Sequence, residues 1–296
     1  MDKVLTLIGP KSQLDETQIS EVIATLAGMG AKIDPPYWLA YRTAVDLRFS
    51  GIECEDSREL AFEALGDIAV DAVAQPLLGR RKRLLVADME STIIENEMLD
   101  ELADEVGIRD QIAEITARAM NGELDFDDAI KERVALLAGL DIGAIERTKK
   151  SIRIMPGAKE LVATMRTNDA YCALVSGGFS SYTADIRDQL GFNFHQANQL
   201  EIADGKLTGQ VIEPILGRNA KKERLLALCK AQNIPIEASI TVGDGANDLT
   251  MLGAAGIGVA YHAKPIVARE AAARIDHGDL TALLYLQGYR DDEFVS

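Results

Sequence analysis

Three short apolar runs, each followed at once by small and polar residues, limit what this chain can fold into more than any other feature. The junctions are residues 84–87 before Asp88, residues 172–175 before Ser176, and residues 240–242 before Gly243 and Asp244. Short apolar runs bounded in this way are typical of buried parallel strands. Ligands bind just beyond the carboxyl ends of such strands. The sequence therefore predicts an α/β fold with a Rossmann-like parallel sheet, whose carboxyl edge gathers a hydroxyl and several carboxylates.

The length and composition favour two domains. The chain has 296 residues, 47% of them apolar, which is enough for more than one buried core. Residues 1–78 are predicted to form a small α+β unit with a helix at 58–73, and residues 79–296 the larger domain. At 45–49, apolar and polar side chains alternate, which predicts a strand with one buried and one solvated face. The basic run at 80–83 is expected to be a solvated linker end.

One long stretch interrupts the alternation of strands and helices in the larger domain. From about residue 98 to residue 154, apolar residues recur at helical spacing in three successive groups. We interpret residues 97–154 as a helical-bundle cap inserted over the strand ends, between the core segments 79–96 and 155–296. Farther along, the Asp-Gly pair at 204–205 predicts a tight hairpin turn.

The composition argues against several classes of partner. The formal net charge is −16, whereas nucleic acids and anionic membranes select a basic face. No apolar run approaches the roughly 20 residues of a membrane span, and residues 1–3 do not begin a signal peptide. The three cysteines include no CxxC pair, which argues against a disulfide scaffold or a zinc site. We therefore expect a cytoplasmic protein that binds neither nucleic acid nor a membrane.

The polar residues after the three runs suit the transfer of a phosphoryl group. Such a site must neutralise phosphate oxygens, align a nucleophile and protonate the leaving oxygen. Asp88 is the predicted nucleophile, because an aspartyl-phosphate divides one difficult step into two. Asp244 could share a divalent cation with Asp88, and hard oxygen ligands beside a phosphate favour Mg²⁺. Ser176 offers a hydroxyl, and the small residues after it leave backbone N–H groups open to phosphate oxygens.

Taken singly, these motifs have plainer explanations. An Asp followed by Ser and Thr is often a helix cap, Ser-Gly-Gly is often a turn, and helix lysines are mostly solvated. Lys221 could supply a positive charge to the site, but so could its neighbour Lys222. The segment 243–248 lacks the acidic alternation of an EF-hand, which argues against a Ca²⁺ loop. All four features in this order, each at a strand end or a helix start, favour one phosphoryl-transfer site.

With these motifs in this order, the chain resembles the haloacid-dehalogenase-like (HAD) phosphotransferases, and within that superfamily the phosphoserine phosphatases. The resemblance runs from about residue 84 to residue 284. It rests on Ser91 and Thr92 in the first motif and on the segments 175–179, 219–221, 242–248 and 261–265. The last of these, Tyr-His-Ala-Lys-Pro, has no catalytic role that can be derived from its residues, but it strengthens the match.

The resemblance implies a role for each matching residue near the phosphate. Lys221, and not its neighbour, becomes the catalytic lysine. Ser176 acts in catalysis, and together with Gly177 and Asn247 it binds the substrate. Asp248 supports either Mg²⁺ or Lys221.

The resemblance also assigns residues of the cap to the substrate's head group. Glu97 meets the substrate's amine and Arg133 meets its carboxylate, while Met120 and Phe126 line the pocket. Judged from the sequence pattern alone, Glu97 and Arg133 would be solvated helix charges, and the resemblance reverses that interpretation. A zwitterion needs an anion facing a guanidinium, and Arg can hold a carboxylate with two parallel hydrogen bonds.

One residue departs from the family pattern, Asp-x-Asp-x-Thr. This chain has Glu90 at the second acidic place. In the family, that Asp protonates the leaving oxygen, activates water and ligates Mg²⁺ through its backbone carbonyl. The resemblance therefore implies that Glu90 has these roles, and that it ligates Mg²⁺ together with Asp88 and Asp244. The extra methylene displaces the carboxyl by roughly 1 Å, and such misplacement can cost ~10²-fold in rate. A natural variant with compensating backbone shifts, a slowed enzyme and a deliberate substitution are the open explanations.

The activity that the resemblance implies is Mg²⁺-dependent hydrolysis of O-phospho-L-serine to L-serine and phosphate, the last step of serine biosynthesis. Transfer of the phosphoryl group to another small alcohol is one alternative. An amino-acid-sensing regulator, with a phosphatase site impaired by Glu90, is another. The expected βαββα order of residues 1–78 resembles an ACT-type module, which implies a homodimer and an amino-acid effector. A docking domain without a ligand is the alternative for this module.

Overall fold

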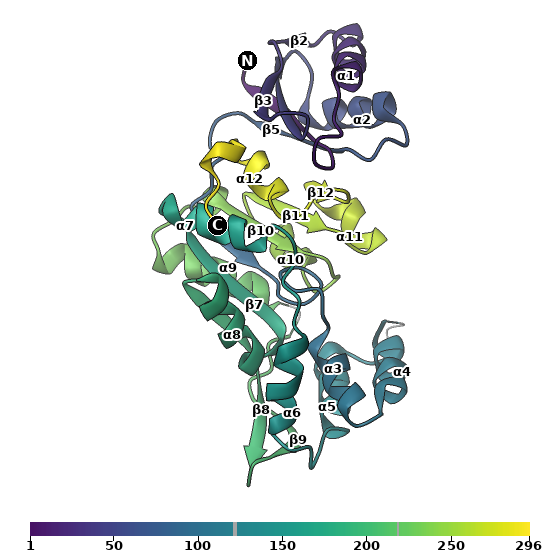
Figure 1. The fold of residues 1–296 in the computed structure, drawn as a ribbon, viewed down its shortest axis with the longest axis vertical. Coiled ribbons are helices and arrows are strands. Elements are labelled where there is room, and N and C mark those ends of the chain that lie inside the picture. The colour runs from purple at the N-terminus through teal and green to yellow at the C-terminus, as the bar shows by residue number, and fades with distance from the viewer. Residues whose placement is uncertain (121–122, 218) are drawn as a thin grey trace.

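Two β-sheets organise the molecule, one in the N-terminal part of the chain and one in the remainder (Figure 1). The computed structural model describes residues 1–120, 123–217 and 219–296, with the side chain of Met120 outside the description. The N-terminal unit lies at one end of the molecule, the cap helices lie toward the other, and the larger sheet lies between them. The predicted α/β class is confirmed.

The N-terminal unit is a five-stranded sheet accompanied by two helices. Its elements are β1 (Lys3–Ile8), α1 (Glu16–Gly28), β2 (Lys32–Ile33), β3 (Tyr37–Ala40), β4 (Ala44–Ser50), α2 (Cys54–Leu65) and β5 (Asp71–Pro76). The strand order is β2-β4-β1-β5, with β3 also pairing with β4, and every pair is antiparallel. The order of elements is therefore βαβββαβ, with two more strands than the sequence predicted.

The helix predicted at 58–73 is wrong in its second half. α2 ends at Leu65, and the next residue, Gly66, has a positive φ of 56° that stops the helix. From Asp71 the chain forms β5, which pairs with β1 from Asp71 to Pro76. A short apolar stretch suits a buried strand as well as a helix, so only the pairing with β1 decides between them.

Both faces of the N-terminal sheet are covered. Leu47 and Phe49 belong to a core cluster with α1 and α2. The opposite face packs on the C-terminal unit, where Thr6 and Asp46 are both 0% exposed. The solvated face predicted at 45–49 is therefore wrong, because another part of the same chain covers it.

The C-terminal unit is built on a seven-stranded sheet. Its core elements are β6 (Leu84–Ala87), α7 (Ala158–Thr167), β7 (Tyr171–Phe179), α8 (Ser180–Leu190), β8 (Phe194–Ala203), β9 (Lys206–Ile212), α9 (Ala220–Ala231), β10 (Ser239–Gly243), α10 (Leu249–Leu252), β11 (Ile257–Tyr261), α11 (Pro265–Glu270), β12 (Ala273–Ile275) and α12 (Ala282–Leu286). The order is β12-β11-β10-β6-β7-β8-β9, and all neighbours are parallel except β8 and β9. The parallel sheet is thus confirmed, with the three apolar runs in adjacent central strands.

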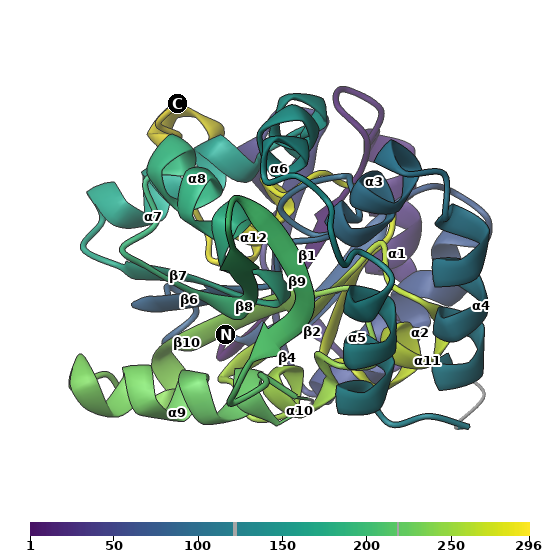
Figure 2. The same ribbon diagram turned by 90° about the horizontal axis from the view of Figure 1, so that it is seen from below.

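Successive residues of the central strand face opposite helix layers. Leu85 of β6 belongs to the core cluster that includes α7, α8 and α12, whereas Leu84 and Val86 belong to a cluster with α9 and α10. Figure 2 shows α7 and α8 on one side of the sheet and α9 and α10 on the other. Burial on both faces explains why these strands are continuous apolar runs. No helix in the described ranges is long and apolar enough to span a membrane.

The stretch predicted as a cap is helical in the structure. Its helices are α3 (Met98–Glu105), α4 (Arg109–Met120), α5 (Phe126–Ala135) and α6 (Gly143–Thr148). The chain enters and leaves this region side by side, since the N–H of Glu95 donates to the carbonyl of Arg153 and the N–H of Met155 donates to that of Ile93, both at 2.9 Å. The helical insertion predicted from the sequence is confirmed.

The Asp-Gly pair forms the predicted hairpin turn between β8 and β9. Asp204 and Gly205 both have positive φ values, 50° and 75°, as a tight two-residue turn requires. The cap contacts this hairpin, since the N–H of Gly139 donates to the carbonyl of Leu207 at 2.8 Å.

The basic run at 80–83 is only partly the solvated linker end that the sequence predicted, because Arg81 and Arg83 are exposed whereas Arg80 and Lys82 are not. Arg80 Nη2 lies 2.6 Å from Asp46 Oδ2, and its side chain is only 11% exposed. Lys82 is also buried, and its Nζ donates to the carbonyl of Glu237 at 2.8 Å. These two charges connect the segment to both units.

Candidate active site

The sheet topology brings the three polar motifs to one place. β6 lies between β7 and β10, and all three run in the same direction. Asp88 follows β6, Ser176 lies near the end of β7, and Asp244 follows β10. The three junctions between apolar runs and polar residues therefore meet at the carboxyl ends of three adjacent strands of one sheet.

Asp88 is fixed at the centre of this edge. It is 5% exposed, and its N–H extends the sheet by donating to the carbonyl of Val242 at 3.0 Å. Its Oδ1 accepts a hydrogen bond from the N–H of Met89 at 2.8 Å and lies 2.7 Å from Lys221 Nζ. Both contacts fall on Oδ1, and neither involves Oδ2.

Lys221 lies between two carboxylates. Its Nζ is 2.7 Å from Asp88 Oδ1 and 2.5 Å from Asp248 Oδ1, and the lysine is 4% exposed. Burial alone lowers the pKa of Lys221, but Asp248 and Asp88 outweigh it and raise the pKa, so this lysine stays charged. Its neighbour Lys222 is exposed. The geometry therefore places Lys221, on the first turn of α9, in the site.

The loop after β10 is folded around Asp248. The N–H of Gly245 donates to Asp248 Oδ2 at 3.1 Å, and the Asp248 N–H donates to the Gly245 carbonyl at 2.9 Å. A Cβ at Gly243 would lie 2.4 Å from Asp248 Cγ, so only glycine fits there. This compact turn places the carboxylate, 0% exposed, behind Lys221.

Asp88, Asp244 and Asp248 form an acidic cluster that fits a hard divalent cation. Each offers an oxygen, and these oxygens lie within 4.8 Å of one another. Burial, and then repulsion from Asp248, raise the pKa of Asp88 to about 7 and that of Asp244 to about 6. Carboxylates held together against such repulsion are the donor set that Mg²⁺ prefers.

Glu90 reaches from the first motif to the base of the cap. Its Oε1 accepts a hydrogen bond from the N–H of Met98, the first residue of α3, at 2.9 Å. Its carboxylate also lies against β7, because a Cβ at Gly178 would come within 2.8 Å of Glu90 Oε2. Burial, and then the charge of Glu97, raise the pKa of Glu90 to about 8. A carboxyl of this kind holds a proton at neutral pH and can donate it.

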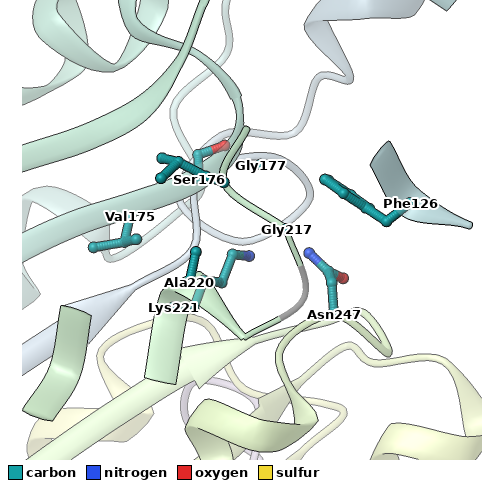
Figure 3. A pocket seen from close by; sticks show the side chains of 9 residues that line it. Phe126, Val175, Ser176, Gly177, Gly217, Ala220, Lys221 and Asn247 are labelled. Carbon is teal, nitrogen blue, oxygen red and sulfur yellow. The ribbon is translucent and has the colours of Figure 1, made fainter. Parts of the chain in front are cut away.

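A small pocket opens beside Lys221, the lysine that contacts Asp88 (Figure 3). Ser176 and Gly177 line it from one side, Lys221 and Asn247 from another, and Phe126 approaches from the cap. Ser176 Oγ accepts a hydrogen bond from the N–H of Gly178 at 2.9 Å, which fixes the hydroxyl at the strand end. Hydroxyl, amide and ammonium groups converge here, as binding of phosphate oxygens requires.

The cap residues predicted to bind the head group lie at the same end of the sheet. Ser91 Oγ donates to Glu97 Oε1 at 2.7 Å. Arg133 Nε donates to the Ala129 carbonyl at 3.1 Å, and the guanidinium has no ion pair within the described part of the chain. Burial lowers the pKa of Arg133, whereas the charges of Glu90, Asp100 and Glu97 act to raise it. The guanidinium therefore lies near these three acids. The predicted role of Met120 concerns a side chain outside the described residues.

Two residues to which the sequence assigned no role also shape the site. Asn198 on β8 donates from Nδ2 to the Gly177 carbonyl at 2.8 Å and accepts from the Leu216 N–H at 2.7 Å, which joins two walls of the pocket. Lys264 donates its N–H to the Asp244 carbonyl at 3.1 Å, and its charge opposes the rise in the pKa of Asp244. Lys264 lies in the unexplained Tyr-His-Ala-Lys-Pro segment, whereas Asn198 had no sequence signal.

Comparison with known proteins identifies the family. The model of the haloacid dehalogenase-like hydrolases matches residues 85–253. A phosphoserine phosphatase of Streptomyces coelicolor is 41% identical over 296 residues, covering 98% of this chain and 71% of the relative. This chain therefore belongs to the haloacid dehalogenase-like hydrolases.

Solved structures extend the similarity to three dimensions. A HAD-family hydrolase of Salmonella enterica serovar Typhi has a TM-score of 0.84 at 26% identity, covering 98% of this chain and 99% of its own. A phosphoserine phosphatase solved as a phospho-aspartyl intermediate analogue has a TM-score of 0.65 at 38% identity, covering 69% of this chain and 98% of its own. The first similarity spans the N-terminal sheet as well as the larger sheet.

Proposed function

We propose that this chain is a phosphoserine phosphatase, which hydrolyses O-phospho-L-serine to L-serine and phosphate with Asp88 as the nucleophile. The observation that carries the proposal is the buried Asp88 carboxylate, held by Lys221 at 2.7 Å beside Asp244 and Asp248. The phosphoserine phosphatase relatives support the substrate.

In the first step, Asp88 Oδ2 bonds to phosphorus, and the bond from phosphorus to the serine oxygen breaks. Oδ1 is held by Lys221 and by the Met89 N–H, which orients the carboxylate for attack. Lys221, Ser176 and Asn247 bind the transferring oxygens, whose charge must be neutralised as the bond breaks.

Glu90 handles the protons of both steps. Its raised pKa, about 8, keeps the carboxyl protonated when the serine oxygen leaves with the bonding electron pair and takes that proton. The resulting carboxylate accepts a proton from water, whose oxygen attacks phosphorus and breaks the bond to Asp88. Phosphate leaves and Glu90 is protonated again. Its longer side chain is accommodated because Gly178, which lacks a Cβ, leaves room for the carboxyl group, while the Met98 N–H holds Oε1.

We further propose that Mg²⁺ is the cofactor, held by the carboxylates of Asp88 and Asp244 and by the backbone carbonyl of Glu90, with Asp248 in support. The cluster of acidic oxygens supports this assignment. A bound dication would draw negative charge from the nucleophile and the phosphate, and would favour the ionised form of Asp88.

We propose that the cap selects the amino acid. Arg133, half-buried and without an ion-pair partner in the described ranges, would bind the substrate's carboxylate, and Glu97 its amine. Phe126 closes the pocket wall next to Gly177. Exclusion of water over the phosphate strengthens each electrostatic contact inside.

The deciding experiment is Mg²⁺-dependent phosphate release from phosphoserine, with Glu90→Asp as the partner variant. Turnover by the parent chain, and a hydroxylamine-sensitive phosphoenzyme that Asp88→Asn lacks, are the expected results. Added small alcohols should not capture the phosphoryl group. Absence of turnover in both the parent chain and Glu90→Asp would reject the assignment, whereas turnover only in Glu90→Asp would indicate an impaired, sensor-like protein.

For the organisation of the chain, we propose a regulatory or dimerisation domain at 1–78 and a phosphatase domain at 79–296. The restriction of one sheet to residues 3–76 supports this boundary. The cap at 97–154 is proposed on the hydrogen-bonded entry and exit segments at residues 93–95 and 153–155. The amino-acid effector and the homodimer stay predictions.

A further inference from the structure

A buried carboxylate of the N-terminal unit binds a loop of the C-terminal unit. Asp71, the first residue of β5, is 2% exposed. Its Oδ1 accepts from the N–H groups of Asp276 at 2.8 Å and His277 at 3.2 Å. Its Oδ2 accepts from those of His277 at 3.2 Å and Gly278 at 2.8 Å. Successive N–H groups that converge on one anion fix the conformation of the loop that carries them.

The same loop holds His262. The ring Nε2 of His262 lies 3.0 Å from the Gly278 carbonyl, and because a carbonyl can only accept, Nε2 carries the proton and donates. The backbone N–H of His262 donates to the Ile275 carbonyl at 2.8 Å. His262 has a positive φ of 42°, which a non-glycine residue keeps only where its surroundings enforce it.

His262 in turn begins the turn that reaches the acidic cluster. Two residues later, Lys264 donates its N–H to the Asp244 carbonyl at 3.1 Å and precedes Pro265 at the start of α11. The described contacts therefore form one path, from Asp71 through Gly278, His262 and Lys264 to Asp244. This path gives the Tyr-His-Ala-Lys-Pro segment a physical role.

We propose that Asp71 and His262 are positioning residues, through which the N-terminal unit sets the affinity of the Asp244 loop for Mg²⁺. The proposal rests on the metal site assigned under the proposed function. Neither residue touches substrate or metal. They hold the turn at 261–265, and this turn fixes the backbone and the electrostatic surroundings of Asp244. Partners of this kind tune metal affinity through the orientation of the ligands.

The test is direct Mg²⁺ binding by calorimetry, with the full chain and no substrate. Asp71→Asn keeps the shape but turns an N–H₂ group toward the backbone N–H groups of the loop. We expect its Kd for Mg²⁺ to rise about two- to thirty-fold, the range of couplings carried through such networks. The KM for phosphoserine, measured at saturating Mg²⁺, should change far less.

Gln75→Met is the matched control. Gln75 lies on the same strand, is 7% exposed, and its Nε2 crosses the same interface to the Leu286 carbonyl at 2.7 Å, away from His262. It should lower the Tm while leaving the Kd for Mg²⁺ unchanged. Equal Mg²⁺ affinities in the parent chain, Asp71→Asn and Gln75→Met would overturn the proposal, even if both variants were less stable.

A second variant keeps the proposal testable if Asp71→Asn folds poorly. Asn tolerates a positive φ but is too short to reach Gly278, so His262→Asn should also weaken Mg²⁺ binding. If the two residues act along one path, the double variant should lose no more affinity than the worse single variant. Fully additive losses, or unchanged Mg²⁺ affinity in His262→Asn, would refute the shared path.

Failure here is distinguishable from failure of the proposed function. If the parent chain hydrolyses phosphoserine and Asp71→Asn binds Mg²⁺ equally well, only the positioning role is rejected. If the parent chain leaves phosphoserine intact but Asp71→Asn binds Mg²⁺ more weakly, the positioning role stands and the substrate is wrong.

Discussion

At the scale of single residues, the site is a set of buried charges, each of which is stabilised by the opposite charge of its neighbours. Asp88, Lys221 and Asp248 are each no more than 5% exposed, and Lys221 is the cation between the two carboxylates. Breaking up such a group leaves buried charge uncompensated. Each residue can therefore be tested by comparing its replacement with the same replacement of an exposed neighbour.

Lys221→Met should abolish most activity, by ~10²-fold or more in kcat, because the transferring oxygens lose their fixed positive charge. Lys222→Met is the matched control, since that neighbour is exposed, and it should retain parental kcat. Phosphate release from phosphoserine measures both variants. Similar kcat values in the two would contradict the assignment of Lys221.

The stability of the metal-free chain should fall as pH rises from about pH 5 to pH 8. Burial raises the pKa of Glu90 to about 8, that of Asp88 to about 7 and that of Asp244 to about 6, so the folded chain holds protons that the unfolded chain has released. Under that condition the free energy of unfolding decreases with pH. Thermal unfolding in EDTA checks this.

Glu90→Gln keeps an acceptor for the Met98 N–H but does not titrate, so its decrease in Tm over that pH range should be shallower. Mg²⁺ competes with protons for the carboxylates, so it should raise the Tm more at pH 8 than at pH 5. A parent chain whose Tm falls no more steeply than that of Glu90→Gln would argue against a raised pKa of Glu90.

At the scale of elements, cap helix α5 carries the predicted selectivity. Arg133→Ala should raise the KM for phosphoserine roughly ten- to hundredfold, the worth of a charge-assisted hydrogen bond. The KM for a phosphate ester without a carboxylate should change little. Lys131→Ala on the same helix is the control, since Lys131 is an exposed partner of Glu213. Equal effects of Arg133→Ala on both substrates would remove the head-group role.

At the scale of the whole molecule, buried polar contacts hold the two sheets together. Asp46 is 0% exposed and pairs with Arg80 at 2.6 Å, while Thr6 Oγ1 donates to its other oxygen at 2.8 Å. Arg80 lies in the segment that connects the two units, and Asp71 of the N-terminal unit accepts hydrogen bonds from the N–H groups of Asp276 and Gly278 in the C-terminal unit, so the N-terminal unit is not freely tethered. Its position is specified by hydrogen bonds as well as by apolar packing.

Arg80→Ala should lower the free energy of unfolding by about 3–5 kcal/mol, because Asp46 would remain buried without its cation. The exposed pair Arg118–Glu132 provides the control, and Arg118→Ala should cost about 0–1 kcal/mol. Urea denaturation measures both. A small effect of Arg80→Ala would show that water reaches Asp46 when the guanidinium is removed.

What could be predicted from the sequence was local in character. Apolar runs and the residues after them predicted the central strands and placed Asp88, Ser176 and Asp244 at one edge, since parallel strands share their carboxyl ends. The Asp-Gly pair predicted its hairpin from turn chemistry alone. The helix predicted through residue 73 failed because its second half is a strand stabilised by β1, a partner far away in the chain.

The order of apolar and polar residues by itself determined the parallel sheet, the helical insertion and the residues that can carry phosphoryl chemistry, because these depend on neighbours along the chain. Only the tertiary structure decided that Asp46 and Arg80 are buried together and that Lys264 contacts Asp244. Burial and charge pairing depend on which distant segments cover a side chain, and a pattern of neighbours does not contain that information.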